Sequence, residues 1–188
     1  MTSTLNIVIL FTLRHCIITN KNPVFILIDD SDWTLIGLDF FQNCRYTRAI
    51  TACRKALLQD PLNAVAWLII GDSLYKLNRY TEAINVYDNV LQITPKNENA
   101  WFHIANAYYQ LGQHKVALEN VNKALSINLF FSQAWLMKGR ILRDLEYYEE
   151  AIWCYDRALE IDPTIKGINK LDCILRLGSY KKIQISSR

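Results

Sequence analysis

The side chains with the most obvious capacity for chemistry are three histidines, five cysteines and a pair of adjacent glutamates. Histidine and cysteine can ligate a metal or act as base and nucleophile, and paired carboxylates can move protons. None of the histidines belongs to a His-x-x-x-His pattern, and neither a Ser-based triad nor a glycine-rich phosphate loop occurs. No set of nucleophile, base and orienting group can be assembled. We therefore predict a chain that is not an enzyme and that needs no cofactor or metal.

The cysteines and the glutamates have simpler explanations. The cysteines are odd in number, widely spaced and without a Cys-x-x-Cys pair, which argues against a disulfide framework and against a zinc site. Free thiols are typical of a reducing compartment, so we expect a cytoplasmic protein. Glu149 and Glu150 fall at the expected start of a helix, where negative charge complements the helix dipole.

Length and charge bound the remaining possibilities. A chain of 188 residues with 51% apolar residues is long enough and apolar enough to bury the core of one ordinary domain. The net charge of +3, with 21% charged residues, is close to balance. We therefore expect neither a nucleic acid nor a strongly acidic partner.

A tryptophan that recurs every 34 residues reveals the elements that must position any functional side chain. The recurring residues are Trp33, Trp67, Trp101 and Trp135. Counting from the Trp of each copy, position +4 is always small: Gly37, Gly71, Ala105 and Gly139. Position +16 is always alanine: Ala49, Ala83, Ala117 and Ala151. Position +28 holds Pro61, Pro95, Leu129 and Pro163. Self-similarity at a fixed period of this size identifies a repeat array.

These residues resemble the tetratricopeptide (TPR) repeat, in which a Trp, a small residue, an alanine of the second helix and a closing proline recur in this order. The resemblance covers residues 30–163 and implies an all-α fold, a right-handed α-solenoid of helix–turn–helix repeats. The four expected repeats are 30–63, 64–97, 98–131 and 132–163. Residues 164–188 are interpreted as a partial fifth repeat, with a capping helix from Thr164 to about Leu177 and a frayed tail.

Apolar spacing within a repeat is helical. Trp67, Gly71 and Leu74 step by three or four residues along a first helix, and the residues from Ala83 onward do the same along a second helix. Gly71 and Ala83 are expected where the two helices approach closely. Proline disfavours helix in the residue before it. Because Asn128 is followed by Leu129 instead of proline, we expect a more continuous helical connection there.

Residues 1–29 do not fit the repeat. Their two apolar runs, at 7–13 and 24–28, are shorter than the roughly 20 residues that span a bilayer, and no basic segment precedes them. The alternatives are a degenerate helix that caps the first repeat, a short hairpin, a poorly ordered arm, or sequence from an incorrectly chosen start codon. We favour a cap or an arm. Attachment to a membrane through this segment is a minor alternative.

The resemblance implies a concave groove lined by the first helices. The residues expected in it share one helical face: Phe41, Leu68, Asp72, Tyr75, Lys76, Asn99, Phe102, Asn106, Tyr109, Gln110, Gln133, Leu136, Arg140 and Arg143. An inert solvated face is the alternative, but large rings on a face that packing does not need favour binding. Chaperone-binding members of the family hold a carboxylate with a Lys–Asn–Arg clamp. Asn106 matches this clamp, but Phe102 stands where a lysine is needed, so the clamp is absent.

The sequence therefore predicts a non-catalytic protein–protein interaction scaffold that binds a partner peptide or helix in the groove. One alternative is an architectural subunit or fragment of a larger TPR assembly that self-associates through its ends or its convex face. Another is a membrane-attached scaffold. Trp153 does not follow the 34-residue period, and its equivalents Thr51, Asn85 and Glu119 are polar. We therefore expect Trp153 on the outer face of a second helix, as a possible contact with another copy of the chain.

Overall fold

The computed structural model describes residues 32–166, together with residues 168 and 174. The predicted N-terminal arm (1–29) and most of the predicted fifth repeat lie outside the described residues. The described residues 164–166 and 168 are not helical, so the helix predicted from Thr164 does not begin there. Asp162 explains the difference, because its carboxylate accepts hydrogen bonds from the backbone N–H and the hydroxyl of Thr164 (2.9 and 2.7 Å) and holds a turn.

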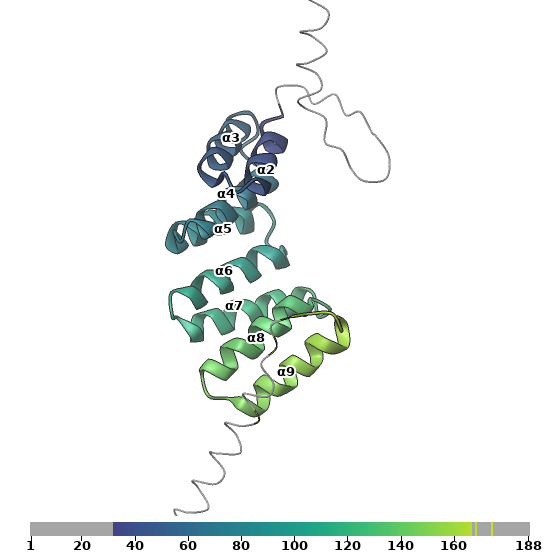
Figure 1. Cartoon of the computed structure of the whole chain (residues 1–188). Helices are drawn as coiled ribbons and strands as arrows, with labels where there is room; N and C mark the ends of the chain where they lie inside the picture. The colour runs from purple at the N-terminus through teal and green to yellow at the C-terminus, as the bar shows by residue number, and fades with distance from the viewer. Residues whose placement is uncertain (1–31, 167, 169–173, 175–188) are drawn as a thin grey trace, which may run out of the picture.

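Eight α-helices and no strand occur in the described part of the chain, which confirms the predicted all-α solenoid. They form four hairpins: α2 (Trp33–Gln42) with α3 (Tyr46–Gln59), α4 (Ala64–Lys76) with α5 (Tyr80–Ile93), α6 (Glu98–Gln110) with α7 (His114–Ile127), and α8 (Ser132–Asp144) with α9 (Tyr148–Ile161). The hairpins follow one another down a single stack (Figure 1). Each hairpin thus buries its apolar faces only against its neighbours, as in other solenoids.

The first and second helices form two layers. Each second helix packs against its own first helix, and α3, α5 and α7 also pack against the first helix of the next hairpin. The first helices also contact one another, α2 with α4, α4 with α6 and α6 with α8. Among the described helices, successive second helices do not approach one another as closely. The first helices therefore form the inner layer and the second helices form the outer one.

The small residue at position +4 is where the two helices of a hairpin meet. A Cβ atom at Gly71 would collide with the ring of Tyr87, and one at Gly139 would collide with the ring of Tyr155. The predicted close approach at Gly71 is therefore confirmed. In the third hairpin Ala105 stands opposite the smaller Val121, and both side chains are fully buried. A larger residue on the second helix thus requires a smaller one on the first.

The turns between hairpins are held by the recurring tryptophans. The indole N–H of Trp67 donates to the carbonyl of Pro61 (3.0 Å), and that of Trp101 donates to the carbonyl of Pro95 (3.2 Å). Trp135 makes the same bond to the carbonyl of Leu129 (2.8 Å). Any residue offers this carbonyl, so the bond does not depend on proline.

The predicted continuous connection between α7 and α8 is therefore wrong. The helix stops at Ile127 and resumes at Ser132, as it does at the other junctions. The side chain of Asn128 accepts a hydrogen bond from the backbone N–H of Phe130 (3.0 Å), as Asp60 does from Leu62 (3.0 Å). This side-chain turn ends the helix without proline.

Candidate functional site

The predicted groove residues lie on the inner layer, and all of them except Leu136 are partly or fully exposed. A hollow of about 230 Å³ crosses this layer, from Phe41 of α2 over α4 to Asn106 of α6. Between them it is lined by Asp72, Tyr75 and Lys76. These five residues come from three successive first helices and were all predicted from the repeat positions. The hollow is therefore part of the predicted groove.

The carboxylate of Asp72, which lines the hollow, is held in place by a hydrogen bond. The hydroxyl of Tyr87, on α5, donates to Oδ1 of Asp72 (2.7 Å). Burial, and then the neighbouring carboxylate of Asp72, raise the pKa of Tyr87 far above its usual value. Tyr87 therefore stays protonated at any physiological pH and keeps donating this bond. One oxygen of Asp72 is thereby occupied before any ligand arrives.

The sixth residue of the hollow, His103, was not predicted. Its Nδ1 lies 3.6 Å from Oδ1 of Asp72, and its ring stacks on Tyr87 with centroids 5.3 Å apart. Position +2 is apolar in the other copies, with Leu35, Ile69 and Met137. The departure from that pattern was the available signal, because a half-exposed histidine stands where the other repeats have an apolar side chain.

Two polar side chains of the hollow have no partner. Among the residues that the structure describes, neither Lys76 nor Asn106 makes a hydrogen bond or an ion pair. Asn106 is the repeat equivalent of Asp72, but the equivalent of Tyr87 is Val121, which has no hydroxyl group. The amide of Asn106 and the ammonium of Lys76 are therefore available to a ligand.

In the half of the groove formed by α6 and α8, polar side chains already form hydrogen bonds with one another. The hydroxyl of Tyr109 on α6 donates to Asp144 at the end of α8 (2.5 Å), and the guanidinium of Arg143 donates to the same carboxylate (2.8 Å). Burial would raise the pKa of Asp144, but these two hydrogen bonds outweigh it and hold the pKa below its usual value. Arg143, predicted as a groove cation, is thus largely neutralised by its neighbour.

The prediction for Leu136 is wrong. Leu136 is only 7% exposed and belongs to a core cluster with Trp135 and Met137. The chain that follows α9 packs against this cluster at Ile165 and Ile168. The repeat pattern assigned Leu136 to the groove face from its own helix alone, whereas Leu136 is buried in a cluster to which other helices and the chain beyond the fourth repeat contribute.

The described residues include no membrane-spanning helix, no cluster of metal ligands and no activated thiol. No described helix is both long enough and apolar enough to cross a membrane. In the same part of the chain, no three His, Cys, Asp or Glu side chains are grouped to hold a metal ion. Burial raises the pKa of the Cys53 and Cys154 thiols to about 11, so neither is an activated nucleophile at neutral pH.

Helical hairpins that repeat every 34 residues and stack into two layers define an α-solenoid repeat protein. The chain belongs to the tetratricopeptide repeat family. Family models described as TPR repeat and tetratricopeptide repeat match residues 71–112, 98–129 and 132–165. A model described as anaphase-promoting complex, cyclosome, subunit 3 matches residues 28–90. No curated protein sequence matches the chain significantly.

Solved structures share the fold at low sequence identity. MamA residues 41-end from Desulfovibrio magneticus RS-1 is 20% identical, with a TM-score of 0.65 over 74% of this chain and 78% of that one. TTC0263, a thermophilic TPR protein of Thermus thermophilus, is 20% identical, with a TM-score of 0.64 over 72% and 76%. YrrB is 22% identical, with a TM-score of 0.60 over 71% and 70%, and is described as a TPR protein with an unusual peptide-binding site.

Proposed function

We propose that this chain is a non-catalytic protein–protein interaction scaffold that holds a segment of a partner protein in its inner groove. The observation that carries the proposal is the hollow across α2, α4 and α6, where two aromatic rings lie beside two polar groups that have no partner among the described residues. Pockets that bind ligands combine apolar walls with a few converging polar groups in this way. A TPR fold, which is typical of interaction scaffolds, supports the same function.

The chemistry of the hollow favours a particular kind of segment. Phe41 and Tyr75 offer apolar surface to a large side chain, and such anchors dominate the energy of interfaces. Lys76 offers a charge for a carboxylate. Asn106 offers an amide that can bond the backbone of a partner whatever its sequence. The expected ligand has an apolar anchor next to an Asp, a Glu or a terminal carboxylate.

A selection from a displayed peptide library on the full chain, followed by fluorescence anisotropy with the selected peptides, tests this proposal. Tyr75→Ala should cost about 1–3 kcal/mol of binding, as the loss of an interface anchor does. Lys76→Ala should weaken binding and reduce its dependence on salt. Tyr147→Ala is the matched control, because Tyr147 is 54% exposed and lies outside the groove. Selected peptides that are basic, or that bind both groove variants as well as the wild type, would rule the proposal out.

A further inference from the structure

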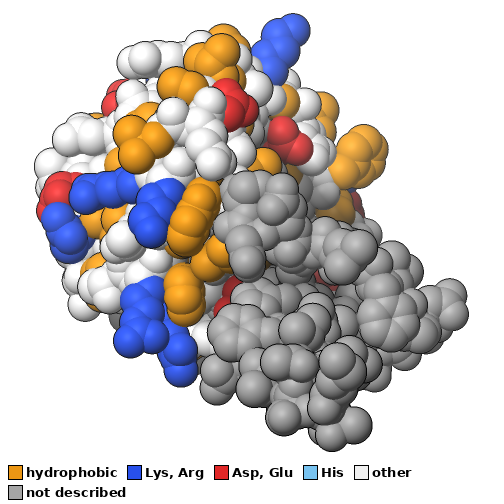
Figure 2. All heavy atoms as spheres, turned by 90° about the horizontal axis from the view of Figure 1, so that it is seen from above, with side chains coloured by type: hydrophobic (Ala, Val, Ile, Leu, Met, Phe, Trp, Pro, Cys, Tyr) orange, Lys and Arg blue, Asp and Glu red, His pale blue; other side chains and the backbone are white. Residues whose placement is uncertain are grey.

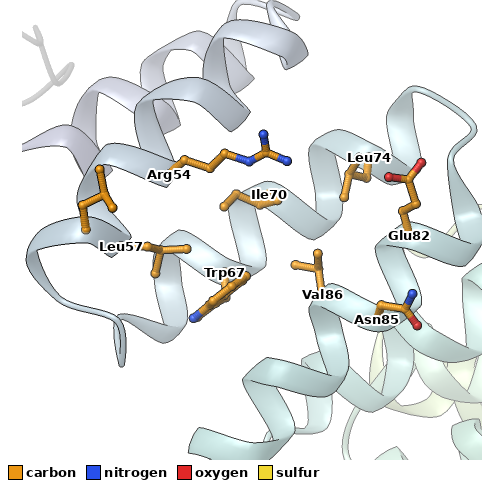
Figure 3. Close-up of a pocket in the computed structure, with 9 residues that line it drawn as sticks. Arg54, Leu57, Trp67, Ile70, Leu74, Glu82, Asn85 and Val86 are labelled. Carbon is orange, nitrogen blue, oxygen red and sulfur yellow. The ribbon is translucent and has the colours of Figure 1, made fainter.

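A second and larger cavity lies on the outer layer. Its volume is about 660 Å³, within the ~300–1,000 Å³ that is usual for ligand pockets. Trp67, Ile70 and Leu74 of α4 form its floor, and side chains of α3 and α5 form its walls (Figure 3). It opens away from the inner groove, because α3 and α5 are second helices. Leu58, on the wall formed by α3, is 85% exposed.

The cavity exists because Trp67 lacks the cover that the other recurring tryptophans have. Residues of the second helix cover those rings. The ammonium nitrogen of Lys55 lies 4.0 Å from the ring centroid of Trp33, and that of Lys123 lies 4.2 Å from the ring centroid of Trp101. The ring of Trp153 packs against that of Trp135, with centroids 5.2 Å apart. The equivalent residues on α5 are Asn89, in place of the lysines, and Asn85, in place of Trp153. Neither asparagine is long enough to cover an indole ring, so the face of Trp67 borders the cavity.

Two further positions at the cavity also depart from the rest of the array. The equivalents of Leu58 are polar in every other repeat: Gln92, Ser126 and Glu160. The equivalents of Arg54, which lies at the rim of the cavity, are acidic or neutral: Asp88, Asn122 and Asp156. An apolar residue and a cation have thus replaced polar and acidic ones at one place on the outer layer. Such a concerted change is typical of a surface that meets a partner.

The charge on this side of the cavity is positive. The helix α3 contains Arg48, Arg54 and Lys55 and no acidic residue, a formal charge of +3. Among the described residues Arg54 makes no ion pair within 4.0 Å, although the pKa of the Glu82 carboxyl is lowered by its hydrogen bond with Arg79 and also by the charge of Arg54. On the opposite wall the carboxylate of Glu82 is bound by Arg79 at 2.7 and 2.6 Å. Lys and Arg side chains gather beside hydrophobic ones on one flank of the stack (Figure 2). An occupant should therefore be apolar and acidic.

The outer face of α9 has this chemistry. The ring of Trp153 is 55% exposed. Glu149 and Glu150 precede it by one helical turn, and both are exposed. Across its length α9 has four carboxylates and one arginine, a formal charge of −3, opposite to that of α3. The second helices of the first and last hairpins are thus complementary in both charge and apolar surface.

We propose that the outer cavity binds α9 of a second copy of this chain, with the exposed edge of Trp153 over Trp67 and Leu58 and the two glutamates beside Arg54. The cavity lies between the first and second hairpins and the α9 face lies on the fourth, so one contact between two copies leaves one cavity and one α9 face unused. The contact is therefore heterologous and can close into a ring or extend into a chain of copies. It does not involve the inner groove, which stays open to a partner.

Sedimentation velocity of the full chain at rising concentration tests the proposal. At low salt the wild type should self-associate, and added salt should weaken the association because the complementary charges are exposed. Leu58→Gln should raise the dissociation constant about tenfold or more, as loss of an anchor does. Leu111→Gln is the matched control, since Leu111 is 39% exposed and lies at the turn between α6 and α7, away from both surfaces. Tyr75→Ala, in the groove, should have no effect.

A charge reversal identifies the two surfaces directly. A chain with Arg54→Glu and a chain with Glu149→Lys and Glu150→Lys should each be monomeric alone and should associate when mixed, because each retains one intact surface and the reversed charges attract. Circular dichroism confirms that each variant is folded. A wild type that stays monomeric at low salt would overturn the proposal. So would association that tolerates Leu58→Gln, or charge-reversed chains that fail to associate when mixed.

Discussion

The outer surface differs sharply between the second and the fourth hairpin. In the fourth, the ring of Trp153 packs edge-on against Trp135 at 5.2 Å, and Trp135 is only 6% exposed. In the second, Asn85 stands where Trp153 stands, and Trp67 lies on the floor of an open cavity. The predicted exposure of Trp153 on a second helix is confirmed at 55%. Two positions of the second helix, those of Asn85 and Asn89, thus decide whether the tryptophan on the outer layer is covered.

The inner packing of the same two hairpins does not differ. Gly71 faces the ring of Tyr87 just as Gly139 faces the ring of Tyr155. The alanines at position +16, Ala83 and Ala151, are both fully buried. The positions that recur set the distance between helices, and the positions that vary set the chemistry of the surface. Function in a repeat array is therefore to be sought where one copy departs from the others.

A larger residue at position +16 should destabilise the chain equally in the second and the fourth hairpin, and it should do so more than any of the substitutions that follow. Ala83→Leu and Ala151→Leu each add three carbon atoms where there is no space, so each should cost about 1–3 kcal/mol of unfolding free energy. Urea unfolding followed by circular dichroism measures both. If one substitution proved harmless, the inner packing of the two hairpins would not be equivalent, and the comparison would fail.

Removing the side chain that covers a recurring tryptophan should lower stability by less, and only in a hairpin where such a side chain is present. Trp153→Ala removes an edge-to-face ring pair, and such a pair contributes about 0.5–1.5 kcal/mol beyond its buried area. Asn85→Ala, at the equivalent position, should change stability by less than about 0.5 kcal/mol. Thermal melts of the two variants measure the difference. Equal losses would mean that Asn85 has a packing role that the open cavity does not reveal.

Adding a missing cover should have the smallest effect, with the opposite sign. Asn89→Lys places an ammonium where Lys55 and Lys123 lie over their indole rings, which should stabilise the chain by about 0.5–1 kcal/mol. Lys123→Ala should lose a similar amount, whereas Lys115→Ala, at an exposed position on the same helix, should lose nothing measurable. The melting temperatures of the three variants provide the test. A destabilised Asn89→Lys chain would contradict the proposed equivalence of these positions.

The period of the tryptophans was sufficient to predict the fold, because helix packing repeats with the residues that cause it. The helix–turn–helix hairpins and the close approach at Gly71 followed from that period. The break at Asn128 did not, because a side chain that accepts a backbone hydrogen bond replaces proline there. Sequence rules based on proline do not detect such a substitute.

The surface could be predicted only in part. Helical geometry assigned Tyr75, Lys76 and Asn106 to the inner face, and all three line the hollow. It could not anticipate that Leu136 is buried in a core cluster, or that Asp144 neutralises Arg143. Burial and charge compensation depend on neighbours in space. The outer cavity was missed for the same reason, since it results from side chains that are too short on the neighbouring helix.

The central claim, that the outer surface is open at Trp67 and closed at Trp135, has a direct measurement. In the full chain labelled with 5-fluorotryptophan, the change of each ¹⁹F shift between H₂O and D₂O reports the exposure of that ring, and single Trp→Phe variants assign the signals. At a concentration where the chain is monomeric, Trp67 should show a change between that of exposed Trp153 and that of buried Trp135. Asn89→Lys should reduce the change for Trp67 alone. A Trp67 signal as protected as that of Trp135 in the wild type would contradict the account.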